Sequence, residues 1–313
     1  PITHPTFDCH DGKAMISYHL GIDIGGSEIK YALGDSKLNL LLSASIPTPS
    51  SGLIPFKEAL HSLIHEIIKS YSITSIGIAT PGTIDQKTGK LFGVNPNLPF
   101  WTDRDPAAIT PRELMIPTFA DNDANLMTLA ESDNYPDAKV VLGLTIGTGI
   151  GSGLTLDGRV YHGGSGAAME LGHTCVVAEG EPCNCGLQGC VEAYSSLTGI
   201  RKRAAKHIPA AISHSLKEIL DVSGKDPHTR QVIQEGSLYL SRAIANAIIL
   251  LDPDVVVIGG GCIDGGLYEI SALESSIKSL LPVQNQNTLI RKAVYGNQAG
   301  VRGALILAIR SLL

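Results

Sequence analysis

Hydrophobic and polar positions form short blocks along the chain, and the first three blocks predict strands. Apolar runs at residues 19–24, 29–33 and 40–42 are separated by a glycine turn and then by a polar turn. Short apolar runs bounded by turn residues are typical of β-strands. The pattern therefore predicts three consecutive strands joined by tight turns.

The second half of the chain repeats this plan. An apolar run at 140–146 leads into a glycine-rich turn at 147–153, and the apolar segment 154–156 precedes an Asp157-Gly158 hairpin turn. Self-similarity of this kind indicates two related halves, each opening with strands that fold back on one another.

Helices and single strands follow each of these openings. Strands are expected at 75–79 and 254–258. Apolar residues at helical spacing, or a polar helix start, predict four helices: 56–71, 121–131, 238–251 and 301–313. The alternation of strands and helices predicts an α/β protein.

The segment Asp-Asn-Tyr-Pro-Asp at 133–137 interrupts the pattern and indicates a domain boundary. We expect an N-terminal lobe at 18–135 and a larger C-terminal lobe at 136–300, with the final helix 301–313 packing back on the first lobe. Residues 1–17 lack an apolar core typical of a secretory signal. They are expected to be a leader that is disordered or foreign to the native protein.

Composition narrows the class of protein. Of 313 residues, 43% are hydrophobic and 17% are charged, which excludes a disordered chain, and no uncharged apolar run reaches the ~20 residues of a membrane span. The net charge of −6 and the single short basic cluster at 201–203 argue against nucleic-acid binding. Four of the six cysteines lie within 175–190, which is unlike a secreted disulfide framework and favours the cytoplasm.

Glycine is in excess, with 34 residues where average usage gives roughly 22. The turn at Gly25, Gly26 and Ser27 exposes backbone N–H groups suited to a phosphate, and Asp23 before it could hold a metal ion through water. The alternative is an ordinary β-turn. The repeated glycines at 147–153 favour a ligand, because each glycine costs a strand about 0.5–1 kcal/mol relative to alanine. Neither turn has a P-loop or dinucleotide fingerprint.

A candidate set of metal ligands follows in the second half. His173, Cys183, Cys185 and Cys190 supply the Cys₃His donors of a tetrahedral zinc site, although the Cys-x-Cys spacing is tighter than usual. The alternative is a cluster of reduced thiols or a redox pair. Cys175 is expected to be a small buried residue outside the set.

Acidic and amide residues at 121–125 open a predicted helix. One of them can cap the helix while another points into a cleft as a base or a ligand for sugar hydroxyls. Glu170 and Glu192 flank the cysteine cluster, so a folded cluster brings both near one place; the alternative is a pair of surface glutamates.

Together these motifs resemble the ROK family of repressors, open reading frames and sugar kinases, from about Tyr18 to the end of the chain. The matching segments are 23–27, 122–125, 147–153, 170–173, 183–192 and 257–261. The resemblance implies an actin-like ATPase (ribonuclease H-like) fold with two lobes and an ATP cleft between them. The family's zinc-containing branch includes bacterial glucokinases and kinases of N-acetylglucosamine and N-acetylmannosamine.

The resemblance also assigns roles to individual residues. Asp123 resembles the general base that takes the proton of the sugar 6-hydroxyl, and His173 serves both the zinc and the sugar. The implied sugar-binding residues are Gly82, Asn97, Asn122, Asp123, Glu170, His173 and Glu192. Met169 stands where the family has a small residue, which bears on the identity of the sugar.

Nucleotide binding is implied at three turns. Asp23 with Gly25, Gly26 and Ser27 resembles one phosphate site, Gly147, Thr148 and Gly149 resemble the second, and Gly259, Gly260 and Gly261 resemble the adenosine side. ATP with Mg²⁺ is the expected donor, with polyphosphate as the alternative. A homodimer or homotetramer and structural Zn²⁺ are further expectations, with no nucleic-acid or membrane partner.

The function that these residues favour is a hexose kinase. Residues 97–101 look glucokinase-like, while 122–131 and 280–283 also resemble N-acetylglucosamine kinases, so glucose is the first expectation and an N-acetylhexosamine is the alternative. A repressor would need a helix-turn-helix domain before the first strand. A sugar sensor is disfavoured by the presence of Asp123, and an ATPase without sugar transfer by the sugar-side residues.

Overall fold

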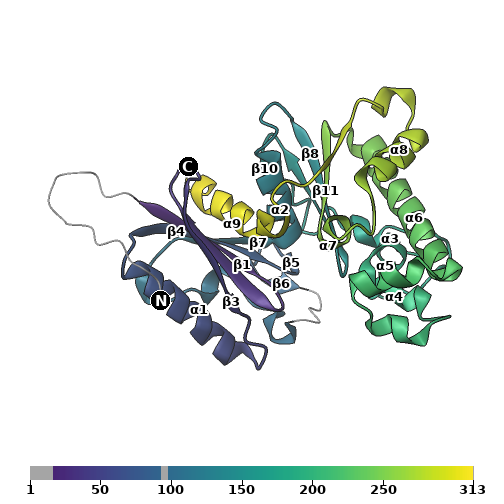
Figure 1. The fold of residues 1–313 in the computed structure, drawn as a ribbon. Helices are drawn as coiled ribbons and strands as arrows, with labels where there is room; N and C mark the ends of the chain where they lie inside the picture. Colours follow the sequence, from purple (N-terminus) through teal and green to yellow (C-terminus); the bar gives the residue numbers. More distant parts are fainter. Residues whose placement is uncertain (1–16, 93–97, 313) are drawn as a thin grey trace.

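Two five-stranded sheets form the framework of the computed structural model, which describes residues 17–92 and 98–312 (Figure 1). The strand orders are β3-β2-β1-β4-β7 and β10-β9-β8-β11-β12. In both sheets the first three strands along the chain pair antiparallel. The fourth strand pairs in parallel with the first, and the fifth pairs in parallel with the fourth. The two halves therefore share one topology, as the repeated pattern predicts.

The bounds of the elements follow the predicted blocks closely. The first sheet contains β1 (Tyr18–Ile24), β2 (Glu28–Gly34), β3 (Leu40–Pro47), β4 (Ile73–Thr80) and β7 (Thr118–Asn122). The second contains β8 (Val140–Ile146), β9 (Ile150–Leu156), β10 (Arg159–Val160), β11 (Val255–Gly259) and β12 (Leu289–Lys292). A small hairpin is formed by β5 (Thr83–Ile84) and β6 (Leu91–Phe92).

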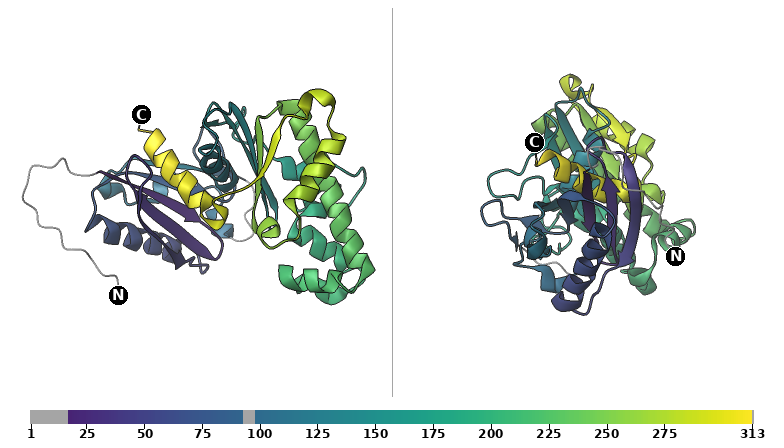
Figure 2. Two further views of the ribbon diagram at one scale, coloured as in Figure 1. Left: turned by 45° about the horizontal axis from the view of Figure 1, so that its top comes forward. Right: turned by 90° about the vertical axis from the view of Figure 1, so that its left-hand side faces the viewer.

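Helices cover both faces of the sheets (Figures 1 and 2). They are α1 (Leu53–Ile68), α2 (Asp123–Ser132), α3 (Val191–Ser195), α4 (Leu197–Ala204), α5 (Leu216–Ser223), α6 (Pro227–Leu251), α7 (Gly261–Asp264), α8 (Ile270–Leu280) and α9 (Ala299–Arg310). Among the described residues, no helix is long and apolar enough to cross a membrane.

Large apolar residues alternate with glycines along parts of β1 and β4, so the two faces of the first sheet differ. Leu20, Ile22 and their neighbours on one face join the hydrophobic core that α1 covers. On the other face, Gly21 and Gly77 lie under α9, where a Cβ on Gly77 would come 1.9 Å from the carbonyl oxygen of Ala304. The last helix of the chain therefore packs at backbone distance on the first sheet.

Helix α2 has the same relation to the second sheet. A Cβ on Gly143 of β8 would lie 2.1 Å from the hydroxyl of Thr128, and one on Gly153 of β9 would lie 2.6 Å from the same atom. Helices α2 and α9 also touch, since a Cβ on Gly303 would come 1.9 Å from the carbonyl oxygen of Leu126. Although α2 precedes the boundary expected at 133–137, it lies on the sheet of the second half.

These contacts correct two details of the sequence analysis. The glycine-rich turn ends at Gly149, because β9 begins at Ile150. Gly153 gives room to helix α2, and Gly151 lies against Ala124 at the start of that helix. The helix expected at 238–251 begins at Pro227, where the Asp226 side chain caps it by accepting a hydrogen bond from the backbone N–H of Thr229. The leader expected at 1–17 lies, apart from its last residue, outside the described residues.

The carboxyl ends of the parallel strands indicate where the candidate site lies. Across β4, Asp23 of β1 pairs with Ala79, and Ala79 pairs with Asp121 of β7, so the two aspartates lie level at one edge of the sheet. Ligands of open α/β sheets bind outside this edge. The site is therefore expected where β1, β4 and β7 end.

Replacing Gly77 with alanine is predicted to destabilise the protein. The added Cβ must push α9 away from β4, and overpacking of this kind costs about 1–3 kcal/mol or more. The free energy of unfolding from denaturant titration measures the loss. Gly224→Ala is the matched control, since its φ of −61° suits any residue and the nearest atom to a new Cβ is 3.4 Å away. Equal stability of the two variants would contradict the close packing of α9.

Candidate active site and metal centre

The start of α2 carries the residues expected to act on the substrate. Asn122 is the N-cap: its side-chain oxygen accepts hydrogen bonds from the backbone N–H groups of Ala124 (2.9 Å) and Asn125 (3.2 Å). Its amide nitrogen donates to the carbonyl oxygen of Gly82 at 3.1 Å. Because Asn122 satisfies the helix end, Asp123 is free of the capping role.

Asp123 is half-buried and has an unusual acidity. Burial raises the pKa of its carboxyl to about 7, and the negative charge of Asp23 adds to the rise. The backbone N–H of Ala124, which donates to Oδ1 of Asp123 at 2.8 Å, acts in the opposite direction. A carboxylate with a pKa near neutrality is well matched to taking a proton from a hydroxyl group.

A pocket between the two halves surrounds this carboxylate. Glu170 and Thr83 share it, and the Thr83 hydroxyl donates to Oε1 of Glu170 at 3.2 Å. Its lining residues come from both halves: Thr83, Asn122, Asp123, Ala124, Asn125, Gly151, Ser152, Gly166, Ala168, Met169 and Glu170. The structure thus brings together three of the expected sugar-binding residues, Asn122, Asp123 and Glu170.

Met169 occupies a strained position in this pocket. Its φ of 64° lies in the left-handed region, which a residue with a side chain seldom adopts. Its carbonyl oxygen accepts a short hydrogen bond from the Ser152 hydroxyl, which in turn accepts from the backbone N–H of Leu171 at 3.2 Å. The hydrogen bond from Ser152 of β9 maintains this backbone conformation, which places the long Met169 side chain against the pocket.

Glu192 lies beneath the glycine turn between β8 and β9. Its Oε2 accepts a hydrogen bond from the backbone N–H of Ile150 at 2.8 Å, and a Cβ on Gly149 would come 2.7 Å from the same oxygen. Glu192 therefore holds the turn that contains Gly147 and Thr148. It does not line the pocket around Asp123, and neither does His173, among the described residues.

The turn between β1 and β2 is closed by backbone hydrogen bonds. Gly25 donates to the carbonyl oxygen of Glu28 at 3.0 Å, while Gly26 and Ser27 are exposed at its tip. At its base, burial raises the pKa of Asp23, and Lys30 opposes the rise from 3.9 Å away. The exposed tip and the buried acid are compatible with a phosphate and its cation.

The third glycine turn joins the end of β11 to α7. Gly260 has a φ of 95°, and a Cβ on it would lie 2.6 Å from backbone atoms of Ile146 at the end of β8. Nothing lies within 4 Å of a Cβ on Gly261. Gly259–Gly261 therefore lies beside the β8–β9 turn with an open face, as a nucleotide-binding turn requires.

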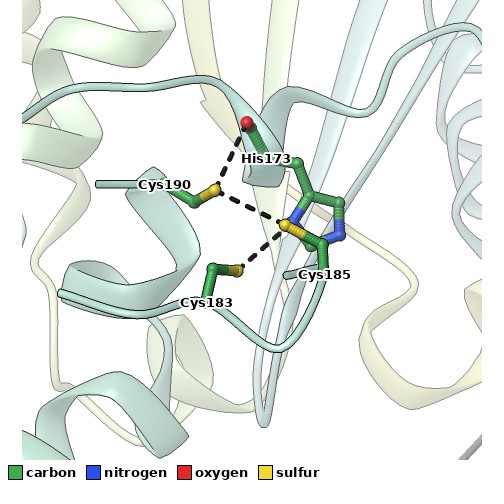
Figure 3. A group of neighbouring side chains, drawn as sticks. All are labelled: His173, Cys183, Cys185 and Cys190. Atoms are coloured by element: carbon green, nitrogen blue, oxygen red, sulfur yellow. Dashed lines mark hydrogen bonds between the residues drawn. The ribbon is translucent and has the colours of Figure 1, made fainter. Parts of the chain in front are cut away.

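The cysteine cluster gathers as a set of metal ligands (Figure 3). The ligand atoms of His173, Cys183, Cys185 and Cys190 all lie within 4.8 Å of one another. The sulfur atoms of Cys185 and Cys190 are 3.6 Å apart, and the sulfur of Cys183 is 3.6 Å from Nδ1 of His173. With zinc–sulfur bonds of about 2.3 Å, tetrahedral ligands lie roughly 3.8 Å apart. The donors therefore fit a zinc ion, and Nδ1 is the nitrogen that faces it.

Three residues need separate mention. Cys175 was expected to be buried but is exposed, because it lies in a loop where its thiol faces the carbonyl oxygen of Val177. Asn97 lies outside the described residues. His162 was missed: its Nε2 is 2.6 Å from Oδ2 of Asp121, and at a separation of 41 positions the sequence offers no signal for that pairing.

We predict about one zinc ion per chain by elemental analysis, bound to these four donors. Cys183→Ser should lose the metal and lower the melting temperature, because a closed structural site contributes folding energy. Cys175→Ser is the control, since this exposed thiol is outside the ligand set. Metal-free protein of unchanged thermal stability would contradict the zinc site.

Comparison with known proteins identifies the family. The ROK family model matches residues 19–311. A glucokinase of Halalkalibacterium halodurans is 32% identical over 91% of this chain and 93% of its own length. An N-acetyl-D-glucosamine kinase of Salmonella paratyphi B is 29% identical over 92% of this chain and 98% of its own length.

The solved structures agree. The ROK hexokinase from Thermus thermophilus superposes with a TM-score of 0.83, at 29% identity, over 94% of this chain and 99% of that one. The actin-like ATPase fold implied by the resemblance is thereby confirmed. On these similarities and on the site described above, the chain belongs to the ROK family.

Proposed function

We propose that the protein is an ATP-dependent hexose kinase that phosphorylates the 6-hydroxyl of glucose. The observation that carries the proposal is the pocket that joins the Asp123 carboxylate to Asn122 and Glu170. A base of neutral pKa is surrounded there by groups able to hold sugar hydroxyls. The similarity to a glucokinase at 32% identity supports glucose.

Asp123 acts on the attacking hydroxyl. The sugar oxygen forms a bond to the γ-phosphorus of ATP, the bond from that phosphorus to the bridging oxygen breaks, and the proton passes to the Asp123 carboxylate. ADP and the sugar 6-phosphate are released. In such transfers most of the catalysis comes from positioning and from electrostatic stabilisation, so the fixed start of α2 is the decisive contribution.

The remaining residues bind the ends of the two substrates. Asn122 and Glu170 hold hydroxyl groups of the sugar, and the exposed tips at Gly26 and Thr148 present backbone N–H groups to the phosphates. Mg²⁺, when bound with ATP, neutralises charge on the phosphates. Asp23 would face that ion through water, and its buried carboxylate fits this role.

Zinc in the Cys₃His set would be structural. His173 and the three cysteines of the loop 183–190 would hold the ion, which would join this loop to the segment that contains Glu170. Nδ1 of His173 faces the ion, so Nε2 is the ring nitrogen left for a part of the sugar that extends beyond the residues lining the Asp123 pocket.

An N-acetylhexosamine is the second candidate substrate. The similarity to an N-acetylglucosamine kinase, at 29% identity over 92% of the chain, supports it. Met169 favours glucose, because its side chain lines the pocket beside Glu170 and takes space that a 2-acetamido group would need.

We predict that Asp123→Asn lowers kcat by about 10²–10⁴-fold, the usual contribution of a general base, while sugar affinity measured by calorimetry stays within a few-fold. Asp221→Asn, an exposed substitution on α5, should leave both unchanged. Wild-type turnover of the Asp123 variant would remove this residue from its role.

The pH dependence tests the same residue. Because Asp123 must be ionised to accept a proton, kcat/KM of the wild-type enzyme should rise as the pH increases through about 7 and then level off. A flat profile between pH 6 and 8 would show that no group of this pKa controls the reaction.

A substrate panel separates the two candidate sugars. In a coupled ATP assay, wild-type protein should prefer glucose to N-acetylglucosamine and N-acetylmannosamine. Met169→Ala should shift the kcat/KM ratio toward the N-acetylated sugars by about tenfold, the lower end of the discrimination that one methylene group gives in a pocket. Met115→Ala, a fully exposed methionine, is the control. An unchanged ratio would remove Met169 from sugar selection.

A further inference from the structure

The segment between β10 and Glu170 starts with a histidine that reaches across to the first half of the chain. His162 is about one-quarter exposed, and its Nε2 lies 2.6 Å from Oδ2 of Asp121, whose side chain is 5% exposed. Asp121 is the penultimate residue of β7, two residues before the proposed base. In the described part of the chain, His162 is the basic side chain that pairs with this buried carboxylate.

The second oxygen of Asp121 is used within α2. Oδ1 accepts hydrogen bonds from the backbone N–H of Asn122 at 2.7 Å and from the side-chain amide of Asn125 at 3.0 Å. One oxygen therefore fixes the start of α2 while the other holds His162. Asp121 is a link between the helix that carries Asp123 and the segment that begins at His162.

His162 also shapes the backbone that follows it. Its carbonyl oxygen accepts hydrogen bonds from the N–H groups of Gly166 (3.1 Å) and Ala168 (3.2 Å). Gly166, at a φ of 99°, presses against β5, where a Cβ would come 2.0 Å from the carbonyl oxygen of Ile84. Glu170 lies four residues after Gly166 and accepts a hydrogen bond from Thr83 of β5. The position of Glu170 thus depends on a turn closed by His162.

We propose that His162 is a positioning residue that, through Asp121, sets the segment 162–170 against the start of α2 and so fixes the distance between Glu170 and Asp123. The inference rests on the proposed function, because these two carboxylates are the groups that hold the sugar there. His162 itself does not line the pocket. It acts on sugar binding and leaves the nucleotide side unaffected.

The charge state of His162 supports this role. The hydrogen bond and the negative charge of Asp121 raise the pKa of His162, and burial opposes the rise. Asp121 is the charged group that acts on the ring. With a raised pKa, the ion pair is complete at low pH and its charge is lost as the pH rises through the pKa of His162.

The test uses His162→Gln, which removes the charge, and Asp121→Asn. The dissociation constant for glucose, titrated without ATP, should rise about tenfold in His162→Gln, the scale of one charge-assisted hydrogen bond, while KM for ATP changes less than twofold. Tyr161→Phe is the matched control, since Tyr161 precedes His162 and is exposed. The double variant should bind glucose no more weakly than the single variant of lower affinity, because both substitutions remove the same contact between His162 and Asp121.

The pH profile separates positioning from a purely structural role. Asp123 titrates in the same range, so wild type is compared with His162→Gln, which shares Asp123. The ratio of their glucose dissociation constants should approach one as the pH rises above the pKa of His162. A ratio that does not change with pH, additive losses in the double variant, or a lower melting temperature with unchanged glucose affinity would each overturn the proposal.

Failure of the proposed function gives a different result. Wild-type protein that neither binds nor phosphorylates a hexose would remove the function and the inference together. Wild-type protein that phosphorylates glucose while His162→Gln binds it equally well would overturn the inference alone.

Discussion

Helix α2 is held at backbone distance on two sides, and the geometry of the site depends on that contact. Gly143 and Gly153 leave no room for a Cβ between the second sheet and Thr128, and Gly303 leaves none between α9 and Leu126. Close-packed interiors transmit small shifts instead of absorbing them. Because α2 is packed without space against both neighbours, a shift of either one moves its first residues, and the proposed base is one of them.

Ionisation of Asp123 lowers the stability of the folded protein, and the close packing of α2 offsets this loss. Its pKa in the folded protein, about 7, is above the ordinary value for aspartate. A raised carboxyl pKa means that its contribution to stability is fully present below the ordinary pKa and is lost as the pH rises through about 7. The ionised form that accepts a proton is thus the form that the fold tolerates least. A helix with little freedom to shift can keep such a group in place.

Much of this arrangement can be predicted from the sequence, and the reasons for the rest are physical. Periodicity and turn residues locate the strands and the repeat, and ligand types at close spacing locate the donors from His173 to Cys190. The role of Gly153 could not be predicted, because the sequence does not distinguish a glycine that packs against a helix from one that contacts a ligand. The pairing of His162 with Asp121 depends on two segments that meet only after both halves have folded.

The segment from His162 to His173 is anchored at its two ends by different chemistry. An ion pair with Asp121 fixes its start, and the Cys₃His ligand set contains its last residue. Between these anchors Met169 keeps a φ of 64°, and Ser152 holds its carbonyl oxygen. A backbone conformation of this kind persists only where the surroundings determine it. The strain therefore lies where the Met169 side chain lines the pocket. The residue that we propose to influence the choice of sugar is thus also the one whose position depends on both anchors.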